Sequence, residues 1–289
     1  MAPKRLAILG VGLLGGSLGL AAKQVVKGCT VIGYGHRRST LDEALRMGAI
    51  DEAFEDPAEA VRHADLTVLC TPVGVFPQLM AAIGPALEPG SLVTDVGSTK
   101  RSIIAITERT IPTGVHFVGS HPMAGSEKRG VTYAQANLFD GAVCITTPTA
   151  KTNPTALAKI ENFWDSVGMH VLRLSPEEHD RRLADVSHLP HALAAALVAM
   201  QDEGSLPLAG KGFQDVTRIA GGDGALWRDI LLDNADNLRD SALRFRKTLD
   251  VLIDRLERGD GEAVRAWLDA AASRRQSLGE RRDSSSAKM

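Results

Sequence analysis

The stretch Leu6-Ala7-Ile8-Leu9-Gly10-Val11-Gly12-Leu13-Leu14-Gly15 decides the fold of this chain. A short apolar run ends in a G-x-G-x-x-G, and a helical pattern from Ser17 to Val26 follows. In that context the glycines let a dinucleotide pyrophosphate approach the backbone, and the helix N-terminus attracts it. A glycine-rich turn that binds nothing is the alternative. The predicted phosphate loop consists of Gly10, Gly12, Leu13, Leu14 and Gly15.

Short apolar runs alternate with helical patterns through the first part of the chain. Continuous apolar strands between helices are typical of a parallel sheet that is covered on both faces. We therefore predict an α/β fold with a Rossmann-type dinucleotide-binding domain over residues 1–174. The predicted strands are residues 6–9, 30–34, 66–70, 92–95, 116–119, 143–146 and 171–174. Helices are predicted, among others, over residues 75–87 and 99–110.

The sequence pattern changes at Ser175-Pro176-Glu177-Glu178, which has the Ser, Pro and Glu positions of a helix start. From there to about residue 278 the patterns are helical, and no strand is predicted. We therefore expect an all-helical domain over 175–279. It has few large apolar residues, which favours a dimer formed through it. The polar residues 280–289 are expected to form a frayed tail. One predicted stripe on the helix 183–200 contains Leu183, Val186, Pro190, Leu193, Leu197 and Met200.

Composition excludes several classes of protein. The 289 residues are 44% apolar and 24% charged, which is ordinary for a globular protein, and the formal net charge is −2. Nucleic acid is a poor partner for such a charge. No signal peptide and no 18-residue apolar stretch is present, so no membrane span is expected. Three scattered cysteines, Cys29, Cys70 and Cys144, favour buried thiols in a reducing cytoplasm over disulfides or a metal site.

The end of the second predicted strand bears on the choice of cofactor. NAD sites usually place an acidic residue about 20 positions after the glycine loop. Here that position is Gly35, and the following residues are His36-Arg37-Arg38-Ser39-Thr40. Guanidinium and hydroxyl groups suit a 2′-phosphate, so NADP is preferred and NAD stays open. Alternatively, Thr40 caps a helix and forms a capping box with Glu43.

Three further segments carry polar residues where a ligand is expected. Residues 95–100 and 119–127 follow predicted strands, and ligands of open α/β sheets bind at those strand ends. The third segment, 186–191, lies within a predicted helix. Its two histidines, His188 and His191, share a helix face, and Pro190 interrupts the helix hydrogen bonds.

Taken together, these motifs resemble the prephenate/arogenate (cyclohexadienyl) dehydrogenases of tyrosine biosynthesis. The matching stretches run from Gly10 to Asn234 and are GVGLLGGSLG, DVGSTK, SHPMAGSEKRG, NLFDGAVCITTP, HD…VSHLPH and GFQDVTRIAGG…LWRDI…N. Other Rossmann dehydrogenases share only the glycine loop. The resemblance implies a nucleotide domain followed by a helical dimerisation domain, with prephenate or arogenate as substrate.

The resemblance also implies roles for particular residues. His121 would take the proton of the substrate hydroxyl, and Ser98 would hydrogen-bond the same hydroxyl and orient His121. Arg218 would pair with the side-chain carboxylate. The remaining members of the expected site are His191 near the substrate, His188 on the nicotinamide side, Glu127 and Asp215 as polar gates or partners of Arg218, and Thr71 and Pro72 at the cofactor.

Simpler interpretations remain for several of these residues. Ser98 could cap a helix that begins at Thr99, Arg218 could pair with Asp215, and the two helical histidines could be core residues. Trp227 is expected to pack rather than to contact substrate. A β-hydroxyacid or imine oxidoreductase and a non-catalytic dinucleotide-sensing dimer are the alternative functions. No separate regulatory module is expected, so inhibition by tyrosine would act at the active site.

Overall fold

The computed structural model describes the backbone of residues 3–126 and 128–286 and the side chains up to residue 278. The chain divides into two compact units, residues 1–238 and 239–289. This division differs from the boundary expected after Leu174, which stays a prediction. No helix within the described ranges is long and apolar enough to cross a membrane.

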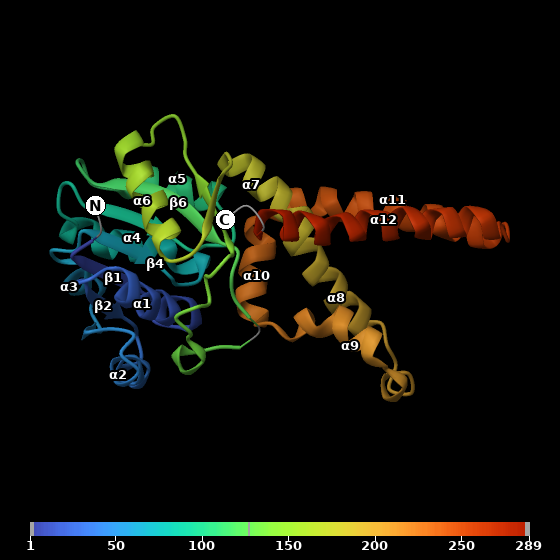
Figure 1. Cartoon of the computed structure of the whole chain (residues 1–289), viewed down its shortest axis with the longest axis horizontal. Helices are drawn as coiled ribbons and strands as arrows, with labels where there is room; N and C mark the ends of the chain where they lie inside the picture. The colour runs from blue at the N-terminus through green and yellow to red at the C-terminus, as the bar shows by residue number, and fades with distance from the viewer. Residues whose placement is uncertain (1–2, 127, 287–289) are drawn as a thin grey trace. The chain divides into compact units, whose positions relative to one another are not determined.

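An eight-stranded sheet forms the centre of the first unit (Figure 1). Its order is β3-β2-β1-β4-β5-β6-β7-β8. The strands are β1 (Arg5–Leu9), β2 (Thr30–Tyr34), β3 (Glu52–Phe54), β4 (Leu66–Leu69), β5 (Leu92–Asp95), β6 (His116–Pro122), β7 (Val143–Thr147) and β8 (His170–Arg173). The seven predicted strands are confirmed, with bounds that differ by three residues or fewer. β3 is an additional short strand at the sheet edge.

The expectation of an all-parallel sheet is wrong at one pair. β7 pairs with β6 in the antiparallel direction, with His121 opposite Ile145, and β8 continues parallel to β7. A parallel pair needs a crossover connection, usually an α-helix. The described part of the connection between β6 and β7 carries only the 3-10 turn Val131–Tyr133, so the chain returns in the opposite direction.

Helices cover both faces of the sheet. Leu6 and Ile8 of β1 belong to one hydrophobic cluster, and Ala7 and Leu9 belong to a second cluster on the opposite face. This two-sided burial explains why the strands are continuously apolar. The first cluster includes residues of α1 (Leu13–Val25), α2 (Arg38–Arg46) and α6 (Pro154–Ser166). The second includes residues of α3 (Pro57–Val61), α4 (Phe76–Ile83) and α5 (Arg101–Thr110).

The strand order reverses between β1 and β4, and ligands of open α/β sheets bind at such a switch point. Gly10 follows β1 and donates its backbone N–H to the Tyr34 carbonyl at 2.9 Å. On the other side, Cys70 donates to the Leu9 carbonyl at 2.8 Å. The glycine loop therefore lies between the carboxyl ends of β2 and β4.

After β8 the first unit is helical, as predicted. The Ser175 hydroxyl accepts the Glu178 backbone N–H at 3.2 Å and so caps α7. The helices are α7 (Pro176–Leu183), α8 (Leu189–Ala199), α9 (Lys211–Thr217), α10 (Gly224–Asp233) and α11 (Ala235–Glu257), with 3-10 turns at Leu206–Leu208 and Arg218–Gly221.

The predicted helix 183–200 and its apolar stripe need correction. A π-helical segment, Ala184–His188, separates α7 from α8 directly before Pro190. The wider turn changes which residues share a face. Val186 and Met200 of the predicted stripe are 70% and 74% exposed. The buried face instead contains His188 and His191.

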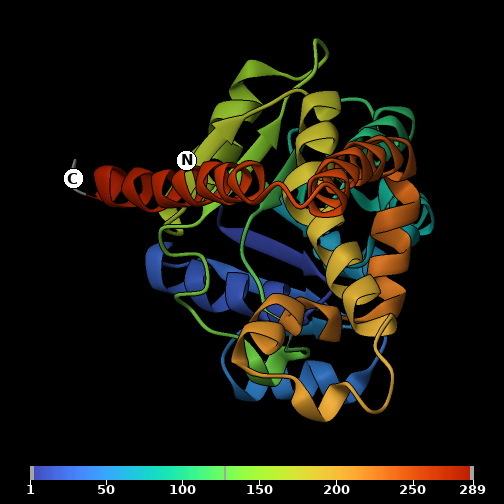
Figure 2. The ribbon, with the colours of Figure 1, turned by 90° about the vertical axis from the view of Figure 1, so that its right-hand side faces the viewer.

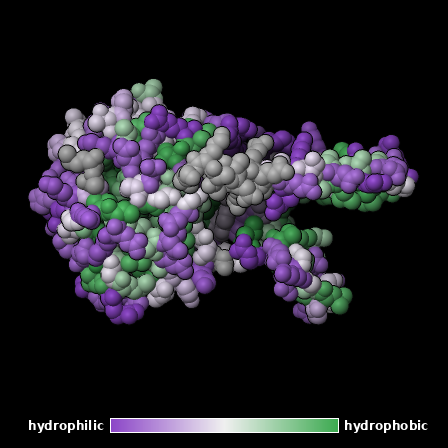
Figure 3. All heavy atoms as spheres, in the orientation of Figure 1, coloured by the Kyte–Doolittle hydropathy of each residue, from purple (hydrophilic) through white to green (hydrophobic). Residues whose placement is uncertain are grey.

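The second unit consists of the rest of α11 and of α12 (Gly261–Ser286). Figure 2 shows the two helices pointing in different directions after the turn that joins them. Figure 3 shows hydrophobic residues among hydrophilic ones on the surface of this unit. Leu249, Ile253, Leu256 and Leu268 are each more than 40% exposed. α12 continues into the segment 280–289 for which the sequence predicts a frayed tail.

Candidate active site

A cavity of about 600 Å³ opens at the carboxyl ends of β1, β4 and β5. Many of the expected site residues line it, from segments far apart in the sequence. They are Gly12, Leu13 and Leu14 of the glycine loop, Thr71 and Pro72 after β4, Ser98 after β5, His191 of α8, and Arg218. His121 and His188 are not among the lining residues, whereas Ala124, three residues after His121, is one of them.

The glycine loop has the geometry that a pyrophosphate requires. Gly10 has φ of +107°, and a Cβ there would lie 2.8 Å from the Cys70 carbonyl carbon. A Cβ on Gly12 would meet no atom within 4 Å. Among the described residues, no side chain caps the start of α1. Its first N–H groups are therefore available to an anion in the cavity, so the residues present fit a dinucleotide.

The basic residues after β2 lie outside this cavity. His36, Arg37, Arg38 and Ser39 are exposed, beside the strand end to which Gly10 is bonded. Arg38 Nε donates to Asp42 Oδ1 at 2.9 Å across one turn of α2. Helix α2 begins at Arg38, so the alternative in which Thr40 caps it is wrong.

His121 lies near the end of β6 and is 7% exposed. Its Nδ1 lies 2.9 Å from Nε2 of His179, and Nδ1 of His179 lies 2.8 Å from Oδ1 of Asp180. Burial holds the pKa of His121 well below its usual value, and nearby positive charge on His179 and Lys100 would act in the same direction. His121 is therefore neutral at pH 7, which is the protonation state of a base.

Asp180 joins this histidine pair to the start of α5. It accepts the backbone N–H groups of Lys100 at 2.8 Å and Arg101 at 3.0 Å, and the Arg101 side chain at 3.2 Å. Burial opposes ionisation of Asp180, but the hydrogen bond from His179 and those from the backbone outweigh it and lower the pKa. Helix α5 begins at Arg101 with Asp180 at its N-terminus, so the expectation that Ser98 caps a helix from Thr99 is wrong.

A buried ion pair joins Lys100, whose backbone N–H is bound by Asp180, to Asp95 at the end of β5. Lys100 Nζ donates to Asp95 Oδ2, and both side chains are fully buried. Asp95 also accepts the backbone N–H of Gly97 at 2.8 Å and that of Ser120 at 2.9 Å. Trp164 donates to the Ser120 hydroxyl at 3.0 Å. These contacts fix the segment after β5, which carries Ser98, against the end of β6, which carries His121.

No role is predicted from the sequence for four residues of the matching motifs, which are Asp95, Lys100, His179 and Asp180. The signal in the sequence was the adjacent pair His179-Asp180, a histidine next to a carboxylate. Their contact with His121, 58 residues away, depends on the tertiary fold.

The two helical histidines of the site have different surroundings. His188 is fully buried, and its Nδ1 lies 3.1 Å from Nδ2 of Asn234. Burial lowers the pKa of His188 to about 4, against the opposing effect of Asp180. His191 stacks on Trp227, with ring centroids 3.5 Å apart and 10° between planes. Among the described residues, His188 Nε2 and His191 Nδ1 have no hydrogen-bond partner.

The remaining expected residues are less informative. Asp215 is exposed on α9 and does not line the cavity, whereas Arg218 does. Glu127 lies outside the described residues. Trp227 lines the cavity as well as packing on His191. Within the described ranges, no group of three or more potential ligands could hold a metal ion.

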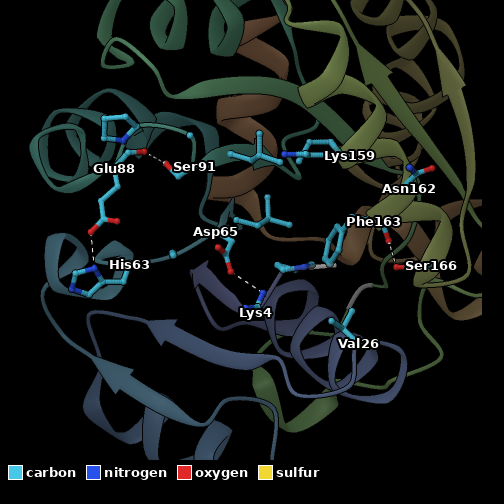
Figure 4. Close-up of a pocket in the computed structure, with 17 residues that line it drawn as sticks. Lys4, Val26, His63, Asp65, Glu88, Ser91, Lys159, Asn162, Phe163 and Ser166 are labelled. Carbon is cyan, nitrogen blue, oxygen red and sulfur yellow. Dashed lines mark hydrogen bonds and ion pairs between the residues drawn. The ribbon is translucent and has the colours of Figure 1, made fainter. Parts of the chain in front are cut away.

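A second cavity, of about 570 Å³, lies at the amino ends of β1, β4 and β5 (Figure 4). Lys4, Lys159 and the His63–Glu88 pair, with Nδ1 2.6 Å from Oε1, surround it. None of the expected site residues that the structure describes lines it. The first cavity is therefore the candidate active site.

The fold and the first cavity together define a dinucleotide-dependent oxidoreductase, because a glycine loop at the switch point and a neutral buried histidine lie at the carboxyl edge of the same sheet. Two family models then match the chain. Residues 18–173 match the prephenate dehydrogenase nucleotide-binding domain, and residues 175–270 match the prephenate dehydrogenase dimerization domain. The chain belongs to the prephenate dehydrogenase family.

Individual relatives agree with this assignment. A prephenate dehydrogenase of Bacillus subtilis (strain 168) is 35% identical over 278 residues, which cover 94% of this chain and 75% of the relative. A cyclohexadienyl dehydrogenase of Zymomonas mobilis is 35% identical over 266 residues, or 90% of each chain. A prephenate dehydrogenase from A. aeolicus, solved in complex with hydroxyphenyl propionate and NAD+, aligns with a TM-score of 0.88 at 33% identity, over 95% of this chain and 98% of that one.

Proposed function

We propose that this chain oxidatively decarboxylates prephenate to 4-hydroxyphenylpyruvate, with His121 as the base. The observation that carries this proposal is the buried, neutral His121 near the end of β6, which is hydrogen-bonded to the His179–Asp180 pair. Ala124, three residues after His121, lines the cavity of the glycine loop. The family assignment supports the same reaction.

The residues of the site then have separate tasks. A dinucleotide held by the glycine loop, residues 10–15, would supply the acceptor for the hydride that leaves the carbinol carbon of the substrate. His121 takes the hydroxyl proton, and Ser98 donates or accepts a hydrogen bond at the same oxygen. Arg218 pairs with the carboxylate of the pyruvyl side chain and so orients the ring. The carboxylate on the ring leaves as CO₂, and its bonding electrons complete the aromatic ring of the product.

NADP is the proposed cofactor, with NAD as the alternative. Arg37, Arg38 and Ser39 are exposed beside the end of β2, and the segment 35–39 contains no carboxylate to repel a 2′-phosphate. The exposed Arg38–Asp42 pair is weak and can open to admit a phosphate. The relative from A. aeolicus was solved with NAD+, which keeps the alternative in view.

Arogenate is a second candidate substrate. It differs from prephenate by an amino group in place of the keto group, so Arg218 would bind the carboxylate that the two share. The relative named cyclohexadienyl dehydrogenase favours this wider range. Tyrosine carries a similar ring and the same carboxylate, so we propose that any inhibition by tyrosine is competitive with the substrate.

A homodimer through the helical region, residues 175–279, is also proposed. No described side chain of α12 is buried, and a lone helix is only marginally stable in water. Its apolar side chains therefore need a partner surface, and the matching family model is described as a dimerization domain. A second copy of this chain is the proposed occupant.

A reducing compartment, the cytoplasm, is the proposed location. All three cysteines are free, and burial raises the pKa of Cys29 to about 11, so its thiol is unreactive.

Absorbance of the reduced nicotinamide tests the function directly. Purified protein is mixed with prephenate or arogenate, each with NAD or NADP. Turnover of prephenate, faster with NADP, is expected. Turnover of arogenate alone would change the substrate and leave the roles of the residues intact. Silence in all four mixtures, with NADP still bound, would favour the dinucleotide-sensing alternative.

A further inference from the structure

We propose that His179 and Asp180 are positioning residues that fix the tautomer of His121. They leave Nε2 of His121 unprotonated, so that it can act as the base. When Nε2 takes the substrate proton, the Nδ1 proton of His121 can pass to His179. The proposal rests on the proposed function for the identity of the substrate. The tautomer itself exists without substrate and can be measured separately.

The direction of the hydrogen bonds follows from the Asp180 end. Asp180 is ionised, and its oxygens accept the N–H groups of Lys100 and Arg101 and the Arg101 side chain. A carboxylate has no proton to donate. The 2.8 Å contact between Nδ1 of His179 and Oδ1 of Asp180 therefore requires that His179 carry its proton on Nδ1.

The protonation of His179 on Nδ1 also determines the tautomer of His121. A neutral His179 with a proton on Nδ1 has a lone pair on Nε2. Its 2.9 Å contact with Nδ1 of His121 is then a hydrogen bond only when His121 donates from Nδ1. The opposite tautomer would bring two lone pairs to the same distance. In the favoured tautomer Nε2 of His121 has no proton, and this is the nitrogen that can accept one from a substrate.

Other charged and titratable groups face the histidine pair. Lys100 is a cation whose charge disfavours protonation of His121, and it is paired with Asp95. His188 faces His121 from the π-helical segment, and its pKa of about 4 makes it neutral. Cys144 of β7 contacts the His121 backbone, and burial raises its pKa, so its thiol stays protonated. Asp180, by contrast, is a carboxylate that is hydrogen-bonded to His179 itself.

Proton transfer follows the same path. The substrate O–H bond breaks and an N–H bond forms at Nε2 of His121. The Nδ1 proton can then move along the 2.9 Å hydrogen bond to Nε2 of His179, where Asp180 stabilises the resulting imidazolium. One proton enters the pair for each hydride that leaves the substrate, so charge and atoms balance. The pair makes His121 a stronger base than its burial alone would allow.

Two substitutions of His179 separate its parts. In His179→Gln a side-chain carbonyl can still accept from His121 Nδ1 but cannot take a proton. In His179→Phe the ring fills the space and offers no acceptor. His170→Gln is the matched control, because His170 is exposed on β8 away from the cavity. NADP binding and thermal midpoints report whether each variant is folded.

Side-chain ¹⁵N NMR of histidine-labelled, substrate-free protein gives the first readout, with His121 assigned from His121→Asn. Wild type and His179→Gln are expected to show Nδ1 protonated and Nε2 bare, and His179→Phe to show a mixture. A wild-type His121 protonated on Nε2 would overturn the proposal, whether or not prephenate turns over. The expected tautomer without turnover would instead retain the proposal and reject the substrate.

The pH profile of kcat/KM gives the second readout. Without an acceptor at Nδ1 the imidazolium of His121 loses its stabilising partner, so its pKa falls. His179→Phe is expected to lower the plateau by roughly 10²-fold and to move the acidic limb to lower pH. The plateau value of kcat/KM should be higher for His179→Gln than for His179→Phe. The pH profile of His170→Gln should match that of wild type. A folded His179→Phe with a lower plateau and an unmoved limb would mean a packing role alone and would contradict the proposal.

Discussion

Asp95 and Lys100 form an ion pair in which neither side chain reaches solvent. The pair closes a short segment on itself, since Asp95 ends β5 and Lys100 directly precedes α5. The same carboxylate accepts the N–H of Ser120 on β6 at 2.9 Å. The Asp95 carboxylate therefore connects β5 and β6. Ser98 follows β5, and His121 lies on β6 next to Ser120.

Breaking this pair should destabilise the protein strongly. Lys100→Met leaves the buried Asp95 carboxyl without its counter-charge, so we expect a loss of about 3–5 kcal/mol in unfolding free energy. Urea unfolding of the variant against wild type measures it. The double variant Lys100→Met/Asp95→Asn removes the buried charge as well and should recover part of the loss. Equal stability of the single variant and wild type would show that the pair contributes little.

Replacing the base should abolish most turnover while the cofactor still binds. His121→Asn is expected to lower kcat by roughly 10²–10⁴, the usual range for a general base. Steady-state rates with prephenate and NADP measure it, and NADP titration of the same variant is the control. A fall of less than threefold would remove His121 from this role.

The sheet was largely predictable because burial on two faces makes its strands continuously apolar. Residues 6–9 of β1 are such a run, with every residue buried. β3 escaped prediction because Glu-Ala-Phe is short and half-buried at the sheet edge. The reversed direction of β7 was also missed, because strand direction depends on the connection rather than on the strand itself.

The candidate site was predictable in part. The glycine loop is contiguous in sequence, so its residues and their chemistry could be read together. His179 was not assigned because its partner lies 58 residues earlier, on another element. The π-helical segment Ala184–His188 was missed because its hydrogen-bond register leaves no periodic apolar pattern. That register decides that His188 is buried while Val186 is exposed.

The buried histidines should make the protein less stable in mild acid. Burial lowers the pKa of His188 to about 4 from an unfolded value of about 6.5. Between these values the unfolded chain binds the additional proton, so stability is complete above about pH 6.5 and falls as the pH drops toward 4. His188 alone would contribute about 3 kcal/mol to this loss.

Urea midpoints at pH 7, 5.5 and 4.5 test this dependence. His188→Asn keeps a side-chain amide near Asn234 and has no titrating group, so its curve should be flatter than that of wild type. His170→Asn, at an exposed site, should leave the slope unchanged. Parallel curves for His188→Asn and wild type would place the acid sensitivity elsewhere.

The 2′-phosphate prediction depends on Arg38. Arg38→Asp introduces a carboxylate beside the end of β2, which should repel NADP and leave NAD binding much less affected. We expect the ratio of kcat/KM for NADP to that for NAD to fall by 10-fold or more, since one charged contact contributes about 1.5–3 kcal/mol. Arg46→Asp, at the far end of α2, is the control for a change of net charge. An equal loss with both cofactors would show that Arg38 does not contact the phosphate.

The dimer prediction depends on the exposed apolar residues of the second unit. Leu268 on α12 is 54% exposed, and a helix without a buried face gains its stability from a partner. Leu268→Glu should bury a charge in the proposed interface and shift the protein from dimer to monomer. Sedimentation velocity over a concentration series measures the shift, with a lower thermal midpoint expected for the monomer. Asp269→Asn changes the neighbouring exposed residue and should leave the dimer intact. A wild-type protein that sediments as a monomer at all concentrations would reject the homodimer.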